Sequence, residues 1–175
     1  MKKITTRQLA LNGIVAALYA ALTILTASFS YGNIQFRIAE ALCVLVCFDP
    51  VFTVGLTLGC LIANLFSTVS ALDLVVGTSA TLIACLLTAR IRRAWLVPVP
   101  TILCNAVFVG AMLAWVLTPG AFWQGFALMG AEVAAGEAAV LYLLGVPLYL
   151  TLRRTGLMGR LLAQPARPAR ASGQD

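Results

Sequence analysis

The sequence predicts an all-α protein, a bundle of six transmembrane helices with both termini in the cytoplasm and an outward-facing ligand pocket. Of its 175 residues, 61% are hydrophobic and only 10% are charged, whereas soluble domains are about half apolar and a quarter charged. Apolar stretches alternate with short polar breaks, and the basic residues form small clusters between the stretches, as topology signals do. We therefore expect one membrane domain over residues 1–162 and a disordered cytoplasmic tail over residues 163–175.

The first apolar stretch covers residues 9–29 and follows a basic start. A cleavable signal peptide would also begin in this way, with a possible cleavage site at residues 28–30. The apolar run of about 20 residues is longer than a normal signal core. We therefore interpret it as a retained span.

The next apolar region, residues 38–66, is interrupted by Asp49-Pro50. Because this dipeptide disfavours helix before the proline and begins a new helix well, we expect two short spans over residues 36–48 and 50–66. The first of them is too short to cross about 30 Å of hydrocarbon at about 1.5 Å per residue. It must therefore be partly shielded by protein, or lie beside a thinned or watery region.

The later spans are expected over residues 72–89, 95–117 and 124–152. The last is longer than a perpendicular span needs, so tilt or a kink near Gly145-Val146-Pro147 is expected. With six spans, the basic clusters all lie on one side, which the positive-inside rule makes the cytoplasmic side. These clusters are Lys2/Lys3/Arg7, Arg90/Arg92/Arg93 and Arg153/Arg154/Arg160.

Charged residues inside the predicted spans mark the candidate site, because each costs about 2.5–3.5 kcal/mol at a helix centre. Arg37 and Glu40 are three residues apart and are expected to pair. Asp73 begins the fourth span, where an N-cap is the alternative to a ligand contact. Glu137, near the middle of the last span, is the foremost ligand candidate, and an interhelical hydrogen bond is its alternative role. Glu132 points about 140° away from it.

Other polar residues carry weaker signals. Asn64 and Asn105 are candidates, although interhelical amide bonds are common in membranes. Tyr31 and Trp123 belong to an aromatic group at the predicted outer rim, where they would anchor the protein at the interface or stack on a flat heterocycle.

Metal and cofactor chemistry is not predicted. The five cysteines form no CxxC pair and the chain has no histidine, so neither a zinc site nor a redox motif is indicated. The sequence also has no phosphate-binding GxxxxGK[ST] loop. Transport would therefore use an ion gradient or other subunits that supply energy.

Small residues in the first span permit close approach of another helix, which is either internal or part of another subunit. They are Ala16, Ala17, Ala20 and Ala21.

Four sequence blocks resemble the QueT family, the membrane-embedded substrate-binding (S) components of energy-coupling factor (ECF) transporters associated with queuosine precursors. Two departures are Ala39, where the family usually has serine, and Val46-Cys47, where it has a proline. The matching blocks are YGNIQFRIAEAL (31–42), GCLIANL (59–65), DLVVGTSATL (73–82), and Gly136-Glu137 with Gly145-Val146-Pro147.

The resemblance implies a multi-pass S component of the bacterial cytoplasmic membrane, which is not itself an enzyme. It would capture a 7-deazaguanine such as preQ1 or preQ0 and join a membrane scaffold subunit and two ATPases, with the alanines of the first helix docking on the scaffold. A carboxylate can accept hydrogen bonds from the donor edge of such a ring. We expect Glu137 and Glu40 to bind the ring edge and the aminomethyl cation, in either order. Supporting contacts are expected from Asp73, Gln35, Arg37, Asn64 and Tyr31.

The sequence is also compatible with two other classes of function. One is a stand-alone proton-coupled secondary transporter of a small basic or donor-rich heterocycle, with Glu137 or Asp73 as the coupling site. The other, a membrane enzyme acting on lipid, is disfavoured because histidine, a metal-ligand cluster and a paired-acid motif are missing from the sequence. The net charge of +6 does not indicate nucleic-acid binding, because most of the basic residues form small clusters between apolar stretches and are not spread over a soluble face.

Overall fold

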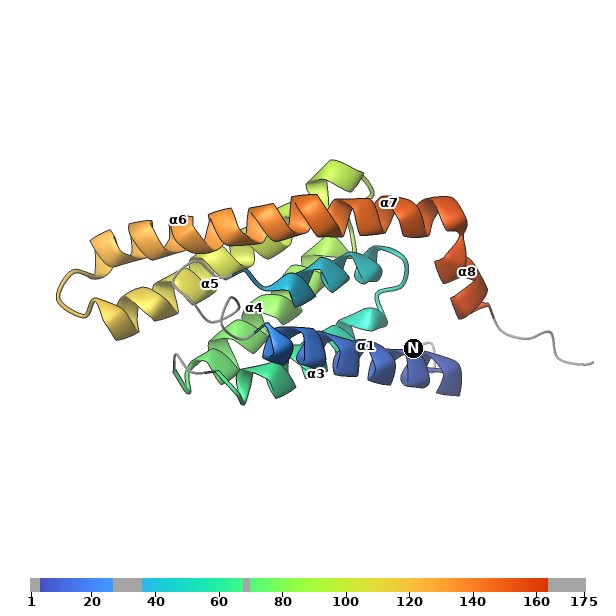
Figure 1. Ribbon diagram of the computed structural model, residues 1–175, viewed down its shortest axis with the longest axis horizontal. Helices are drawn as coiled ribbons and strands as arrows, with labels where there is room; N and C mark the ends of the chain where they lie inside the picture. Colours follow the sequence, from blue (N-terminus) through green and yellow to red (C-terminus); the bar gives the residue numbers. More distant parts are fainter. Residues whose placement is uncertain (1–3, 27–35, 68–69, 164–175) are drawn as a thin grey trace, which may run out of the picture.

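The computed structural model describes residues 4–26, 36–67 and 70–163 (Figure 1). The regular elements of these residues are all helices, which confirms the all-α prediction. In chain order they are α1 (Thr6–Leu25), η1 (Ile38–Cys47), α3 (Phe52–Asn64), α4 (Asp73–Thr88), η2 (Ala94–Leu96), α5 (Val99–Leu117), α6 (Phe122–Val140), η3 (Leu141–Gly145), α7 (Val146–Thr155) and α8 (Leu157–Leu162). The predicted tail lies, apart from Ala163, outside the described residues.

Within the described part of the chain, three helical segments are long and apolar enough to cross a membrane: Thr6–Leu25, Ala94–Leu117 and Phe122–Thr155. Three shorter apolar helices accompany them, η1, α3 and α4, with 10, 13 and 16 residues. The chain therefore has the helices of a multi-pass membrane protein, and the count of six spans stays a prediction.

The helix boundaries follow local sequence signals. Thr5 and Gln8 form a capping box at the start of α1, in which each side chain accepts a hydrogen bond from the backbone N–H of the other. The predicted break at Asp49-Pro50 is confirmed, and the Asp49 carboxylate accepts from the Val51 N–H at 3.0 Å. Gln8 Nε2 also donates to Asp49 at 3.2 Å, so this turn is held beside the first turn of α1.

η1 is the central element of the bundle. It is a 3₁₀ helix that packs against α1, α3, α4, α6, η3 and α7, and Figure 1 shows it in light blue between α1 below and the long α6–α7 helix above. At about 2.0 Å per residue, its 10 residues extend about 20 Å. Because seven of the 10 are buried, the predicted shielding by protein is confirmed.

The last long helix is irregular where a kink or tilt was expected. α6 continues through the π-helical segment η3 into α7, and η3 ends at Gly145, two residues before Pro147. A proline within a helix removes one hydrogen-bond donor and crowds the preceding turn, and a π-helical turn accommodates both effects. α7 then ends at Thr155, its C-cap Gly156 has a left-handed φ of +63°, and the short helix α8 follows.

Two helix pairs approach so closely that only glycine fits at the contact. A Cβ on Gly59 of α3 would lie 2.7 Å from the carbonyl oxygen of Ala16 in α1. A Cβ on Gly110 of α5 would lie 2.7 Å from the Cα of Gly130 in α6. These contacts bring the backbones of α1 and α3, and of α5 and α6, into direct contact.

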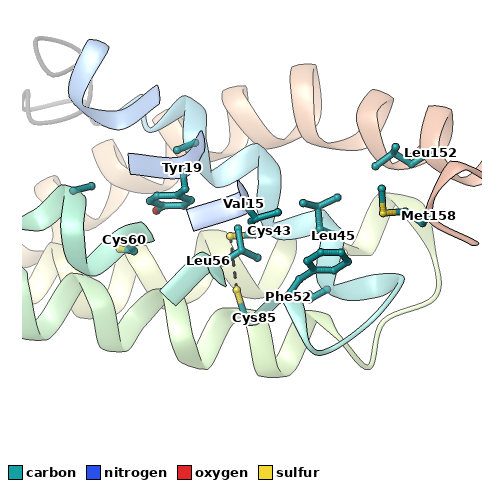
Figure 2. Close-up of a cluster of buried hydrophobic side chains, with 13 residues drawn as sticks. Val15, Tyr19, Cys43, Leu45, Phe52, Leu56, Cys60, Cys85, Leu152 and Met158 are labelled. Atoms are coloured by element: carbon teal, nitrogen blue, oxygen red, sulfur yellow. Dashed lines mark hydrogen bonds between the residues drawn. The ribbon is translucent and has the colours of Figure 1, made fainter. Parts of the chain in front are cut away.

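The largest hydrophobic core joins α1, η1, α3 and the C-terminal helices (Figure 2). In it Cys43 of η1 faces Cys85 of α4, with 3.9 Å between the two sulfur atoms. Cys47, four residues after Cys43, instead donates to the backbone carbonyl of Thr88. The described cysteines are free thiols that pack in the interior, as small apolar residues do.

The two ends of the described chain meet. The Arg7 guanidinium of α1 donates to the carbonyl oxygens of Arg160, in the last turn of α8, and of Ala163, which directly follows that helix. The Tyr149 hydroxyl of α7 donates to the carbonyl oxygen of Arg92, so the loop before α5 lies beside the helix that ends in the last basic cluster. Arg7 and Arg160 therefore lie at one end of the bundle, and Lys2 and Lys3 lie outside the described residues.

Candidate functional site

Four of the charged residues predicted for the site lie in the interior and not on the lipid-facing perimeter. Their exposed fractions are 1% for Arg37, 0% for Glu40, 0% for Asp73 and 1% for Glu137. Glu132 is half-buried. Four fully buried ionisable groups in one small bundle require partners from the protein, from a ligand, or from both.

Arg37 forms an ion pair with Asp73, and the predicted pairing of Arg37 with Glu40 is wrong. Arg37 Nη2 lies 3.1 Å from Asp73 Oδ2 and donates to Asn64 Oδ1 at 3.2 Å. Arg37 is the residue that precedes η1, with a ψ of 86°, so its side chain does not follow the helical register that would bring it over Glu40. It reaches α3 and α4 instead.

Asp73 does not cap α4 with its side chain, so the N-cap alternative is also wrong. The cap position is Leu72, and no side-chain cap hydrogen bond forms there. The Asp73 carboxylate accepts from Arg37 and, at 2.9 Å, from the Ser67 hydroxyl. Asn64 Nδ2 donates to the Asp73 backbone carbonyl at 3.0 Å, so the network ties α3 to the start of α4.

Glu40 accepts hydrogen bonds from three helices. Its Oε1 accepts from the Tyr19 hydroxyl of α1 at 2.5 Å and from the Thr81 hydroxyl of α4 at 3.2 Å. Its Oε2 accepts from the Cys43 thiol one turn later in η1 at 3.0 Å. Both oxygens therefore have donors within the protein, and the carboxylate joins η1 to its neighbours.

Tyr19 and Thr81 were missed by the sequence analysis as partners of a buried acid. Tyr19 is 1% exposed and Thr81 is fully buried. The sequence does hold a signal for Tyr19, because a tyrosine in an apolar span needs a partner for its hydroxyl when it is buried. Thr81 lies in the DLVVGTSATL block and has no comparable signal.

Glu137 lies between α5 and α6 and has one protein partner among the described residues. Asn105 Nδ2 of α5 donates to Glu137 Oε1 at 3.0 Å. Glu137 Oε2 and Asn105 Oδ1 are buried and have no hydrogen-bond partner in the part of the chain that the structure describes. Glu137 also interacts electrostatically with Glu40 and Arg37. The interhelical hydrogen bond that was the alternative role of Glu137 is thus present, and it leaves the second carboxylate oxygen, Oε2, without a described partner.

Two predicted site residues, Tyr31 and Gln35, lie outside the described residues. The outward-facing pocket that they would help to line therefore stays a prediction. Trp123 is 78% exposed and contacts Phe122 edge to face, so it does not belong to the buried polar group. An exposed tryptophan of this kind suits an anchor at the membrane interface.

The small residues of α1 divide between two faces. Ala16 lies against Gly59 of α3, and Ala20 is buried. Ala17 and Ala21 are exposed. The structure therefore places Ala16 against α3 and buries Ala20, and it leaves Ala17 and Ala21 on the surface.

Comparison with known proteins relates the chain to transporters. The family model described as "QueT transporter" matches residues 9–154. The "Queuosine precursor transporter QueT" of Lactococcus lactis subsp. cremoris is 39% identical over 85 residues, which are 47% of this chain and 50% of that protein. The chain thus spans about half the length of the curated relative it matches, and no solved structure matches it. Because the family model covers most of the chain, including every described residue of the buried polar group, the chain belongs to the QueT transporter family.

Proposed function

We propose that this chain is the substrate-capture subunit of an ATP-driven importer of the ECF type, which takes up a queuosine precursor. The ligand would be a 7-deazaguanine such as preQ1 or preQ0. The observation that carries the proposal is a buried carboxylate with an unused acceptor oxygen, Glu137, in a chain of the QueT transporter family. The name of the Lactococcus lactis relative supports the choice of a queuosine precursor.

The proposed topology has six spans in the bacterial cytoplasmic membrane, with both termini in the cytoplasm and a pocket that opens outward. The contact of Arg7 with the end of α8 supports termini on one side. The central position of the short helix η1 supports a count of six, because a helix surrounded by protein need not cover the full hydrocarbon thickness.

The proposed ligand contacts are the carboxylates of Glu137 and Glu40, one for the donor edge of the ring and one for the aminomethyl cation of preQ1. Charge-assisted hydrogen bonds of this kind are about twice as strong as neutral ones. The supporting residues belong to the Arg37 network, with Tyr31 and Gln35 from the segment before η1. In this network Asp73 and Asn64 hold the Arg37 guanidinium and so keep the buried charge compensated.

The proposed partners are a membrane scaffold subunit and two ATPase subunits, which would supply the energy that this sequence has no phosphate-binding loop to supply. The exposed face of α1 that carries Ala17 and Ala21 supports docking on a scaffold helix, because small residues allow two helices to approach closely. The alanines at positions 16 and 20 would act from inside, by keeping α1 close to α3.

Ligand binding is tested with the detergent-solubilised protein. Mass spectrometry of co-purified small molecules identifies the ligand class, and calorimetry with preQ1 measures its affinity. Glu137→Gln should lower the affinity at least about tenfold, since a hydrogen bond to a charged group contributes about 1.5–3 kcal/mol. Glu132→Gln is the matched control, because this acid is half-buried on the same helix. Unchanged affinity in Glu137→Gln contradicts the assignment.

Energy coupling is tested separately by uptake of labelled preQ1 into cells that lack the pathway to make it. Uptake should require co-expression of the scaffold and both ATPases. Uptake by this chain alone that collapses with the proton gradient would contradict the ECF proposal and favour a proton-coupled secondary transporter.

A further inference from the structure

Two buried acceptor oxygens lie on facing helices without a partner in the described part of the chain, Glu137 Oε2 and Asn105 Oδ1. Each side chain is 1% exposed. The two residues are joined through their other atoms, since Asn105 Nδ2 donates to Glu137 Oε1 at 3.0 Å. The hydrogen bond fixes the direction of the amide, so Asn105 presents its oxygen, and not its NH₂ group, as the free atom.

The other buried acids do not share this feature. The oxygens of Glu40 accept from Tyr19, Thr81 and Cys43. Asp73 Oδ2 accepts from Arg37 and Ser67, and Asp73 Oδ1 accepts from Arg37 at 3.4 Å. Several threonine hydroxyls are also buried without a described partner. A buried hydroxyl without a partner costs less free energy than a buried carboxylate oxygen without one, because unsatisfied charged groups cost more than neutral ones.

The free-energy cost of leaving Glu137 Oε2 and Asn105 Oδ1 unpaired indicates the chemistry of the group that would bind them. A buried acceptor without a donor destabilises the protein, and a charged acceptor does so more than a neutral one. Two buried acceptors on residues that are hydrogen-bonded to each other require two donors, and no described donor of the protein reaches them. A heterocycle that carries a ring N–H next to an exocyclic NH₂, as guanine does, supplies two adjacent donors from one rigid edge.

We propose, on the basis of the proposed function, that Asn105 is a specificity-determining ligand contact that acts together with Glu137 on this donor edge. The Glu137 carboxylate accepts the ring N–H through Oε2, because the more acidic donor suits the charged acceptor. Asn105 Oδ1 accepts the neighbouring exocyclic amine. The oxygens of Glu40 already accept hydrogen bonds from α1, η1 and α4. Glu40 then attracts the aminomethyl cation by its negative charge.

The inference predicts how the protein discriminates between ligands. A 7-aminomethyl-7-deazaguanine offers both donors, whereas the corresponding 7-deazahypoxanthine has no exocyclic amine. Binding the second compound leaves Asn105 Oδ1 without a partner. The wild-type protein should therefore prefer the first compound by about tenfold or more, which corresponds to about 1.4 kcal/mol.

The test compares the affinities of both compounds for the wild type and for Asn105→Leu, measured by calorimetry on the full chain in detergent. Leucine approximates the shape of asparagine and removes the acceptor. Asn105→Leu should lower the affinity for the amine-bearing compound by about tenfold and change that for the amine-free compound by less than about threefold. The preference should then disappear. Asn105→Ala serves as a second variant if leucine prevents folding.

Asn12→Leu is the matched control. Asn12 is also a buried asparagine, 5% exposed, but both of its polar atoms have partners, the Gln8 carbonyl at 2.9 Å and the Gly55 N–H at 2.7 Å. Its replacement should lower the thermal stability and leave the ratio of the two affinities unchanged.

Two results overturn the inference while leaving the proposed function intact. One is a wild-type protein that binds both compounds equally well. The other is an Asn105 variant that keeps the wild-type preference, or that loses affinity for both compounds equally, which would show that Asn105 only positions Glu137. A folded wild-type protein that binds neither compound contradicts the proposed ligand, and the inference with it.

Discussion

Replacing Asp73 by asparagine tests whether the Arg37–Asp73 ion pair stabilises the bundle. The variant keeps the shape of the side chain and an acceptor for the Ser67 hydroxyl, but removes the negative charge 3.1 Å from a guanidinium that is 1% exposed. Removing one partner of a buried ion pair typically costs about 3–5 kcal/mol. Asn64 Oδ1 still accepts from Arg37 at 3.2 Å. We therefore expect a loss near the lower limit, about 3 kcal/mol.

The contribution of the pair itself is isolated by a double-mutant cycle with Arg37→Met. Arg37→Met/Asp73→Asn leaves no buried charge at this position, so it should be less destabilised than the sum of the single variants by about 2 kcal/mol or more. The assay is reversible unfolding by SDS titration in mixed micelles, followed by the fluorescence of the three tryptophans. Additive effects, or an Asp73→Asn variant within about 0.5 kcal/mol of the wild type, would refute the reasoning. Glu132→Gln, on a half-buried acid, is the control and should lie within about 0.5 kcal/mol.

Three further predictions concern α1 and its contacts. Gly59→Ala should lower the free energy of unfolding by about 1–3 kcal/mol, because the new Cβ would meet the α1 backbone. Gly13→Ala, whose new Cβ would have nothing within 4 Å, should raise the free energy of unfolding by about 0.5–1 kcal/mol. Tyr19→Phe should lower it by about 1–3 kcal/mol, because Glu40 loses a buried donor. Ala17→Leu, on the exposed face of α1, should leave the affinity for preQ1 unchanged and reduce co-purification of the scaffold subunit.

The outcomes that contradict these predictions are distinct. Equal stability of the two glycine variants would show that α1 and α3 are not in backbone contact. A Tyr19→Phe protein as stable as the wild type would show that the hydroxyl is not needed by the acid. Full co-purification of the scaffold with Ala17→Leu would place the docking surface elsewhere.

The positions of the helices were largely predictable because their signals are local. The break at Asp49-Pro50 was found where it was predicted, and the predicted gap between residues 117 and 124 agrees with α5 ending at Leu117 and α6 beginning at Phe122. The 3₁₀ geometry of η1 was not predictable, because its residues would also suit an α-helix. That geometry arises where a short segment is surrounded by neighbouring helices over seven buried positions.

The composition of the buried polar group was predictable, but its pairing was not. Charged residues in apolar stretches identified Arg37, Glu40, Asp73 and Glu137 as interior residues, since lipid exposure would be costly. The spacing of Arg37 and Glu40 predicts that these two pair, whereas the structure pairs Arg37 with Asp73, which is 36 residues away. Spacing rules apply within one regular helix, and Arg37 precedes η1 with a ψ of 86°.

The sequence by itself determined that the chain is an all-helical membrane protein with acids in its interior. Hydropathy, helix breaks and the cost of lipid-exposed charge are sums over neighbouring residues, and a single chain displays all of them. The tertiary structure alone decided which buried acid is left with an unused oxygen. That outcome depends on the rotation and separation of helices, set here by glycine contacts such as Gly110 against Gly130, which place Asn105 of α5 on Glu137 of α6. Hydrogen bonds form or fail over a few tenths of an ångström, so their partners follow from the packing of the folded bundle.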